Sequence, residues 1–170
     1  YTAEEEKEFL RDHMYPALVK YDLQGIEIFI WDHNKERIYE RACTIIDDDT
    51  DHMVAGLAFH WYSGDHFEAL ELIKNKFPDK KLILSEACIE YSKFMAADYL
   101  ANAHKYARDI IGNLNAGMTA FYDWNLVLDE TGGPNHVNNL CDAPYLYDIK
   151  NKQLMERNTL AYIWHFSHFI

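Results

Sequence analysis

The stretch LILSEAC, residues 82–88, runs from three apolar residues directly into Ser85 and Glu86. A short continuous apolar run is typical of a strand buried on both faces of a parallel sheet. A carboxylate at the end of such a strand lies at the sheet edge where α/β enzymes build their active sites. Glu86 is therefore a candidate reactive group, and the alternative is a solvated strand end.

Four such apolar runs alternate with helical segments along the chain. The predicted strands are IEIFIW at 26–31, VAGLAFHWY at 54–62, KLILSE at 81–86 and MTAFYDW at 118–124. Strands separated by helices predict βα units with a parallel sheet, and both a doubly wound sheet and a (β/α) barrel fit this pattern. No glycine-rich phosphate-binding motif follows any strand, which disfavours a nucleotide-binding version.

Capping residues and prolines predict where the intervening helices begin and end. Thr2 with Glu5 forms a capping box ahead of a helix that is expected to reach Tyr21, with a kink or an extra turn at Pro16. Its residues Leu10, Met14 and Leu18 are expected to share one apolar face. Asp65 is predicted to cap a helix ending near Phe77. The other predicted helices span 36–46, 95–115 and 157–169, and residues 125–156 are predicted to be irregular.

Polar or aromatic side chains stand at the end of every predicted strand. They are Asp32 after the first strand, His60 and Tyr62 at the second, Glu86 at the third, and Asp123 with Trp124 at the fourth. Each has a structural alternative, such as a helix cap, a core histidine or a tryptophan that plugs the sheet. Their coincidence at four consecutive strand ends favours a shared active site.

Composition excludes several classes of function. The formal net charge of −12 argues against a nucleic-acid partner, and no apolar stretch is long enough to span a membrane. Three cysteines without a C-x-x-C pair make a poor disulfide framework, and Cys88 fits a small buried filler better than a nucleophile. The nine histidines form no HExxH motif, so neither a metal nor a cofactor is predicted. The cellular compartment is left open.

Several separated motifs resemble glycoside hydrolase family 30, the family of acid β-glucosidase. They are LILSEAC, AFHWYSGDH at 58–66, FYDWNLVLDETGGPNHVNN at 121–139 and HFSHFI at 165–170. The resemblance covers essentially the whole chain and places it in the C-terminal half of the catalytic barrel. It implies that residues 1–170 supply the last four units, strands five to eight, of a (β/α)8 barrel.

The resemblance also implies a retaining β-glycosidase that acts on a β-linked glycoside, with Glu86 as the nucleophile. It assigns substrate contacts to Trp124, His60, Tyr62 and Asn139. It assigns supporting roles to Asp32, Cys88 and Asp123. His136 departs from the family pattern, where a tryptophan is expected, so the aglycone preference stays open.

A retaining glycosidase needs a second carboxyl group as acid and base. The family carries it in an Asn-Glu-Pro that is absent from this sequence, so we expect it upstream of residue 1. The chain is accordingly expected to be a fragment that is inactive alone and pairs with a second copy through its open sheet edges. The alternative is a half-barrel or sugar-binding remnant without enzyme activity.

Overall fold

The computed structural model describes residues 1–94 and 98–170, which fold as two compact units. The first unit comprises residues 1–85 and 113–121. The second comprises residues 86–112 and 122–170. The chain therefore passes from one unit to the other between Ser85 and Glu86, directly at the proposed nucleophile.

The first unit is built on a four-stranded sheet in the order β1-β2-β3-β4. The strands are β1 (Phe29–Asn34), β2 (Gly56–His60), β3 (Lys81–Glu86) and β4 (Ala120–Phe121). β1 pairs with β2 and β3 with β4 in parallel, which confirms the predicted parallel α/β class. Leu57, Ala58 and Phe59 of β2 are buried in succession, as expected for a strand covered on both faces.

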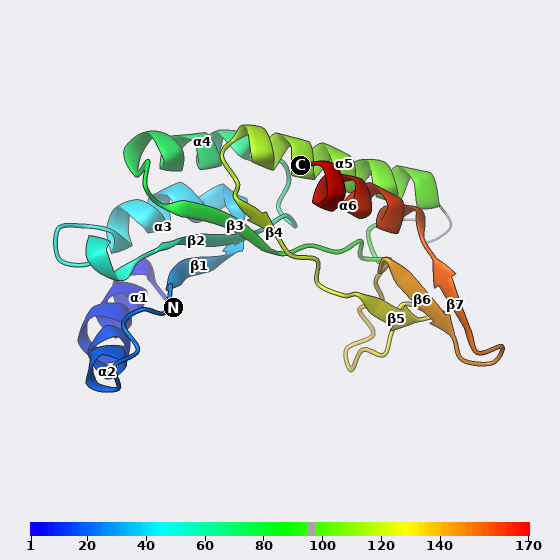
Figure 1. Ribbon diagram of the computed structural model, residues 1–170, viewed down its shortest axis with the longest axis horizontal. Coiled ribbons are helices and arrows are strands. Elements are labelled where there is room, and N and C mark those ends of the chain that lie inside the picture. The colour runs from blue at the N-terminus through cyan, green and yellow to red at the C-terminus, as the bar shows by residue number, and fades with distance from the viewer. Residues whose placement is uncertain (95–97) are drawn as a thin grey trace. The chain divides into compact units, whose positions relative to one another are not determined.

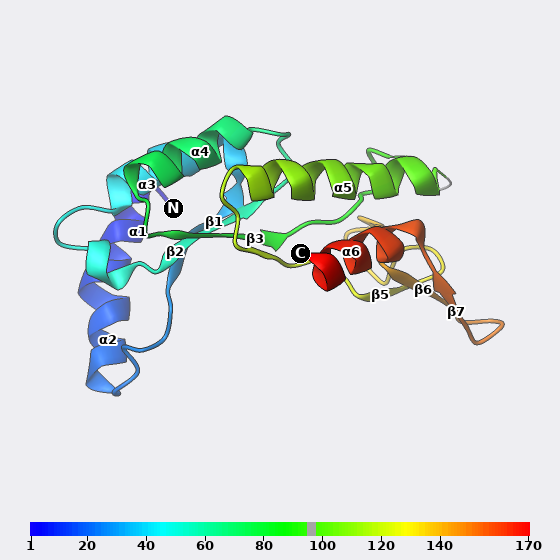
Figure 2. The ribbon, with the colours of Figure 1, turned by 45° about the horizontal axis from the view of Figure 1, so that its top comes forward.

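Helices α3 and α4 pack against each other in this unit (Figures 1 and 2). The helices and turns of the unit are α1 (Ala3–Phe9), η1 (Leu10–Met14), α2 (Tyr15–Lys20), η2 (Lys35–Arg37), α3 (Ile38–Ile45), η3 (Asp51–Met53) and α4 (Phe67–Lys76). Ile38, Ala42 and Ile45 recur on one side of α3 and are fully buried. This apolar stripe packs α3 against β1 and β2.

The first predicted helix is correct at its start and in its irregularity at Pro16, whereas its predicted apolar face of Leu10, Met14 and Leu18 is wrong. The capping box forms as expected, since the Glu5 N–H donates to Thr2 Oγ1 at 3.1 Å and the Thr2 N–H to Glu5 Oε2 at 2.8 Å. Just before Pro16 the helix widens into the π-helical turn η1, because proline lacks an N–H and its ring crowds the preceding turn. This turn changes the register, so that Leu10 is buried while Met14 is exposed.

The helix predicted to be capped by Asp65 begins later than expected. Its N-cap is His66, which has a left-handed backbone (φ 37°) and forms no side-chain cap hydrogen bond. Gly64 also has a positive φ of 119°. The left-handed loop carries the chain past Asp65 before the helix starts, which moves the cap by one residue.

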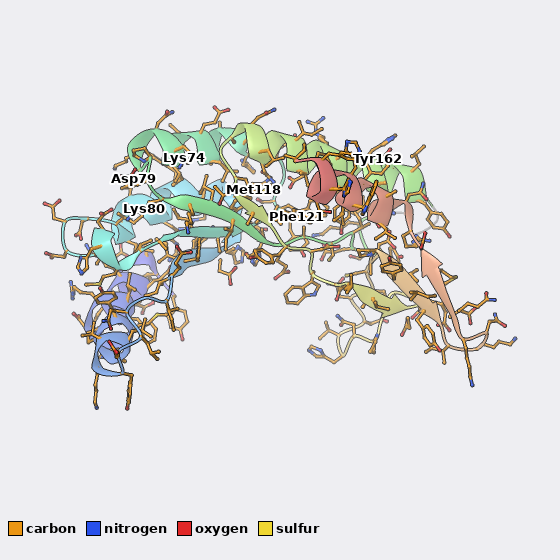
Figure 3. The ribbon with its side chains drawn as sticks, in the orientation of Figure 1. Lys74, Asp79, Lys80, Met118, Phe121 and Tyr162 are labelled. Carbon is orange, nitrogen blue, oxygen red and sulfur yellow. The ribbon has the colours of Figure 1, made fainter. Side chains whose placement is uncertain are left out.

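Two lysines form hydrogen bonds at the amino ends of β2 and β3, at the edge of the sheet opposite to the carboxyl ends that carry His60 and Glu86. Lys74 donates through Nζ to the carbonyls of Pro78 and Lys80, and Lys80 donates to the carbonyl of Val54 at 2.9 Å. Figure 3 shows Lys74, Asp79 and Lys80 near the loop between α4 and β3. This end of the sheet is therefore occupied by structural contacts.

Gly56 leaves no room for a side chain at the start of β2. A Cβ atom there would lie 2.2 Å from the Lys81 carbonyl oxygen and 2.9 Å from its carbon. Because backbone atoms must move to relieve this clash, Gly56→Ala is expected to lower the free energy of unfolding by about 3 kcal/mol. Urea denaturation of the full-length protein measures it. The control is Gly25→Ala, at an exposed glycine with nothing within 4 Å, which should change stability by less than about 0.5 kcal/mol. Equal effects at the two sites would contradict the steric argument.

The second unit contains a small sheet that the sequence did not predict. Its elements are α5 (Tyr99–Asn115, whose last turn belongs to the first unit), β5 (Val127–Asp129), β6 (Tyr145–Asp148), β7 (Gln153–Glu156) and α6 (Asn158–Phe169). β5 pairs with β6 in parallel and β6 with β7 antiparallel, so the prediction of an irregular 125–156 segment is wrong. Residues 95–97, at the start of the predicted 95–115 helix, lie outside the described residues.

The polar composition of 125–156 reflects tight turns between these strands. Asp129 Oδ1 accepts hydrogen bonds from the backbone N–H groups of Thr131 at 2.8 Å and Gly133 at 2.9 Å. Asp148 Oδ1 likewise accepts from the Asn151 N–H at 2.8 Å in the β6–β7 turn. Aspartate side chains that bond nearby backbone groups stabilise turns, which is why the segment resembles an irregular loop in sequence.

Candidate active site

Three neighbouring strands of the first unit bring polar side chains together near their carboxyl ends. Asp32 Oδ1 accepts a hydrogen bond from Ser85 Oγ at 2.7 Å and lies 3.1 Å from His60 Nε2. Asp32 comes from β1, His60 is the last residue of β2 and Ser85 is the penultimate residue of β3. Ser85 Oγ also lies 3.3 Å from the Phe59 carbonyl oxygen, a longer contact than the one to Asp32.

A bulge in β1 aims Asp32 at this cluster. The pairing register with β2 shifts between Trp31 and His33, and Trp31 and Asp32 both have left-handed backbones with φ of 78° and 48°. The Trp31 N–H is satisfied by Glu6 Oε1 at 2.7 Å. Bulges commonly redirect a side chain near an active site. The prediction that Asp32 follows the strand is therefore wrong, because Asp32 lies within β1 at the bulge.

Aromatic rings surround His60 in the same unit. The His33 ring stacks on it with a centroid distance of 5.9 Å, and the Tyr62 ring meets it edge-on at 6.1 Å. Tyr62 lies two residues beyond β2, where its N–H donates to Asn34 Oδ1 at 3.0 Å. The imidazole is thus held by ring contacts and by Asp32, which fixes its orientation.

In the second unit, Glu86 and Trp124 lie on adjacent segments. Glu86 is the half-buried last residue of β3, and the carbonyl of the next residue, Ala87, accepts a hydrogen bond from the Trp124 N–H at 2.9 Å. Trp124 lies three residues after β4, a strand of only two residues where seven were predicted. Its side chain is 58% exposed. The indole therefore offers an apolar face to a ligand beside the segment that carries Glu86.

Asp123 links Trp124 to helix α5. Its Oδ1 atom accepts hydrogen bonds from the Tyr106 hydroxyl at 2.8 Å and from the Trp124 N–H at 3.0 Å. Oδ2 is buried and has no hydrogen-bond partner among the described residues. Burial raises the pKa of Asp123 to about 7, and burial also raises the pKa of Tyr106 well above its usual value. Asp123 thus holds a proton near neutral pH and positions the Trp124 backbone.

The raised pKa of Asp123 predicts a stability that falls with rising pH. An unfolded aspartate loses its proton above about pH 3.9, while the folded protein keeps it up to about pH 7. The unfolded state therefore binds fewer protons in this window, so the contribution of Asp123 to stability decreases between these values and is constant above. Asp123→Asn keeps the Oδ1 acceptor and cannot ionise, so it should gain stability over wild type as pH rises from about 5 to 8. Urea denaturation of both full-length proteins across this range measures the difference.

The control for this prediction is Asp129→Asn, which should behave oppositely. Hydrogen bonds from the Thr131 side chain and the Gly133 backbone lower the pKa of Asp129. Its stabilising contribution is present above the unfolded pKa and is lost as pH falls through the folded one. The Asp129→Asn variant should therefore lose stability relative to wild type as pH rises through about 4. A pH-independent difference for Asp123→Asn would contradict a raised pKa at that position.

Cys141, a residue that the sequence analysis did not single out, connects Asn139 and Cys88 in the second unit. Asn139 Nδ2 donates to Glu90 Oε1 at 3.3 Å. Cys88 Sγ lies 3.5 Å from Cys141 Sγ, and Cys141 in turn donates to the Asn139 carbonyl. Cys88 and Cys141 are 53 residues apart in sequence, and no local pattern connects them.

Sequence reasoning also missed Tyr106 and His33. Tyr106 is fully buried on the inner side of α5 together with Ala103 and Ile110, where an apolar residue would fit the same pattern. Asn102, Asp109 and Asn113 of α5 are buried as well, so a polar group on this side of the helix is no distinguishing signal. Nothing in the sequence identifies Asp123 as the partner of the Tyr106 hydroxyl. His33 was passed over because the predicted first strand ended at residue 31.

The described residues also line cavities beyond the Asp32, His60 and Ser85 cluster. The first unit has a cavity of about 460 Å³ lined by Tyr1, Glu5, Glu6, Phe9, Trp31, His33 and Arg41. The second unit has one of about 590 Å³ between α5 and α6, whose lining includes Tyr162, labelled in Figure 3. Neither is lined by a predicted site residue. Within residues 1–94 and 98–170, no helix is long and apolar enough to cross a membrane, and no cluster of three potential metal ligands occurs.

Comparisons with known proteins agree with these observations. The glycosyl hydrolase family 30 TIM-barrel domain matches residues 1–170. The chain is 32% identical over 177 residues to "Putative glucosylceramidase 3" of Caenorhabditis elegans, and 29% identical over 178 residues to the lysosomal acid glucosylceramidase of Mus musculus. Each alignment covers all of this chain and 34% of the relative, so the chain spans about a third of the length of these curated relatives.

A solved structure shows the same fold. The crystal structure of SrfJ from Salmonella typhimurium matches with a TM-score of 0.93 at 38% sequence identity, covering 100% of this chain and 38% of that one. The family resemblance inferred from the motifs is confirmed by these matches.

Proposed function

Because the chain belongs to glycosyl hydrolase family 30, we propose that it carries the nucleophile, Glu86, of a retaining β-glycosidase. Membership of the family supports a glycosidase, and the names of the two glucosylceramidase relatives suggest a β-glucoside, such as a glucosylceramide, as substrate. Within the barrel we propose that residues 1–170 supply the last four βα units, strands five to eight.

The observation that carries the proposal is the position of Glu86. It ends β3 at the carboxyl edge of a parallel sheet, where barrel enzymes place their catalytic groups. The carbonyl of the next residue, Ala87, accepts a hydrogen bond from the backbone N–H of Trp124. A carboxylate at this edge, on a segment hydrogen-bonded to the one that carries an exposed tryptophan, suits a glycosidase nucleophile.

The proposed mechanism assigns a role to each part of the site. Glu86 attacks the anomeric carbon to form a glycosyl-enzyme, while a second carboxylic acid about 5–5.5 Å away protonates the departing oxygen. Water then hydrolyses the intermediate with that second group acting as base, which retains the configuration. Trp124 stacks on the sugar ring, and His60, Tyr62 and Asn139 bind its hydroxyl groups. Asp32 orients His60, in keeping with their 3.1 Å contact.

We propose that the second acid lies in a part of the protein outside this chain. Asp123 is protonated below about pH 7, but its Oδ1 is occupied by Tyr106 and Trp124 and its Oδ2 is buried. It therefore supports the Trp124 backbone and does not protonate a leaving group. We give Cys88 a supporting role on the segment that follows Glu86, where it is buried and its thiol donates to Cys141 Sγ.

Covalent labelling tests the proposal directly. The full-length protein would be incubated with an activated fluoro-glucoside, which traps the glycosyl-enzyme by slowing its hydrolysis. We expect one sugar per molecule, attached to the peptide that contains Glu86. The Glu86→Gln variant is the control and should remain unlabelled. A label on another carboxylate, or none at all with an otherwise active enzyme, would overturn the assignment.

A second candidate is sugar binding without turnover. The observation that favours it is the 58% exposed Trp124 side chain, which is sufficient for a binding platform. In that case the full-length protein would bind a β-glucoside, with quenching of tryptophan fluorescence, while releasing no glucose. Measuring both on one preparation separates the two functions.

A further inference from the structure

Two buried thiols face each other close to the proposed nucleophile. Cys88 and Cys141 are 3% and 5% exposed, and their Sγ atoms are 3.5 Å apart. Cys88 lies two residues after Glu86, and Cys141 lies two residues after Asn139. Both belong to the second unit, so their contact lies within one compact body.

The backbone holds the two cysteine segments in register. The Tyr91 N–H donates to the Leu140 carbonyl at 2.9 Å, and the Asp142 N–H to the Ile89 carbonyl at 2.8 Å. Glu90 and Cys141 form an antiparallel bridge between these bonds. Because the segments are already paired, the thiols can be joined without a change in how the two segments pair, and only a local shift is needed.

The hydrogen bonds also prepare one thiol for reaction. The Cys88 thiol donates to Cys141 Sγ, and the Cys141 thiol donates to the Asn139 carbonyl. The hydrogen bond from Cys88 lowers the pKa of the Cys141 thiol. A thiolate is the reactive form of cysteine, so this hydrogen bond favours Cys141 as the attacking thiol.

We propose that Cys88 and Cys141 form an oxidative modification site that a peroxide closes to an intrachain disulfide. The Cys141 thiolate attacks one peroxide oxygen, breaking the O–O bond and forming a sulfenic acid and hydroxide. Cys88 then attacks that sulfur, forming the S–S bond and releasing the sulfenic oxygen as water. Two thiols and one hydrogen peroxide thus give one disulfide and two waters.

Closure changes the proposed active site. An S–S bond is about 2.05 Å long, so the sulfur atoms must approach by about 1.5 Å from their separation of 3.5 Å. The strain falls on the segments that begin at Glu86 and Asn139, which on the proposed function are the nucleophile and a substrate contact. Oxidation is therefore expected to lower glycosidase activity several-fold, and thiol reductants are expected to restore it.

The test uses the full-length protein with Cys43→Ser as background, because Cys43 is partly exposed and is contacted by Lys76 Nζ. After graded hydrogen peroxide and alkylation of free thiols, non-reducing peptide mapping should show a peptide pair joined through Cys88 and Cys141. Dithiothreitol should release it. The Cys141→Val variant keeps a buried apolar side chain and should yield no linked pair and no peroxide-dependent, reversible loss of activity.

Each outcome bears on the proposal. Linked peptides in the background protein and none in Cys141→Val support it. Direct conversion of the thiols to sulfinic and sulfonic acids, without any linked pair, would overturn the modification site. A linked pair with unchanged activity would overturn the proposed effect of the disulfide on the active site. The peptide readout is independent of turnover. Failure of Glu86 labelling alongside a linked pair would therefore remove the proposed function and leave the modification site standing.

Discussion

Glu86→Gln in the full-length protein is expected to lower kcat/KM for an aryl β-glucoside by about four orders of magnitude or more. Glutamine keeps the shape of the side chain but cannot form the glycosyl ester, so the double displacement loses its first step. Removal of an attacking group has effects of this size, whereas removal of a binding contact costs far less. Initial rates with a chromogenic glucoside measure the change.

A nearby carboxylate provides the matched control. Glu90 lies four residues further along the same segment, where it bonds Asn139 and Lys93. Glu90→Gln should change kcat/KM only several-fold, because in the proposed mechanism Glu90 neither attacks the sugar nor transfers a proton. Thermal unfolding of both variants should match wild type. Comparable losses for the two variants, or undiminished activity in Glu86→Gln, would end the hypothesis.

The largest expected effect on stability comes from Asp142. Its Oδ1 accepts hydrogen bonds from Arg157 Nε at 2.9 Å and from the Tyr91 hydroxyl at 3.1 Å, and the Asp142 and Arg157 side chains are 1% and 8% exposed. Asp142→Ala removes the carboxylate and leaves the guanidinium charge buried without it. We expect a loss of about 3–5 kcal/mol in the free energy of unfolding, measured by urea denaturation at neutral pH.

Two further variants separate charge from shape. Asp142→Asn keeps an oxygen acceptor and should cost less than Asp142→Ala. Replacing both partners with apolar residues, as Asp142→Leu with Arg157→Met, removes both charges and should recover much of the lost stability. A loss below about 1 kcal/mol in Asp142→Ala would show that Arg157 is stabilised by other neighbours, among them the Tyr99 ring, whose centroid lies 3.6 Å from Arg157 Cζ.

The positions of the four main strands follow from local sequence, and both ends of β3 agree with the prediction, but the ends of β1, β2 and β4 do not. Continuous apolar runs predict β2 and β3 because burial on both faces selects apolar residues at every position. β1 continues past Trp31 through Asp32 to Asn34 because a bulge lets polar residues stay in the ladder. Hydrophobic patterning contains no signal for that bulge. The β5–β7 sheet was missed because its short strands are separated by turns rich in polar residues, which resemble an irregular loop in sequence.

The candidate site was predictable where it depends on strand order and unpredictable where it depends on distant contacts. Glu86 and His60 were placed correctly at strand ends, since parallel strands align their carboxyl ends. The link from Asp123 to Tyr106 joins residues separated by 17 positions on different elements. Such a contact is set by how α5 packs, and no spacing rule applies to it.

The left-handed backbone at Asp32 makes this position one where folding and chemistry favour different residues. A left-handed conformation costs an ordinary residue about 1 kcal/mol that glycine does not lose. A population selected only for heat resistance is therefore expected to drift towards glycine at residue 32. One selected for turnover should keep the carboxylate that accepts the Ser85 hydrogen bond. Sequencing both populations after several rounds would show which pressure has shaped the first strand.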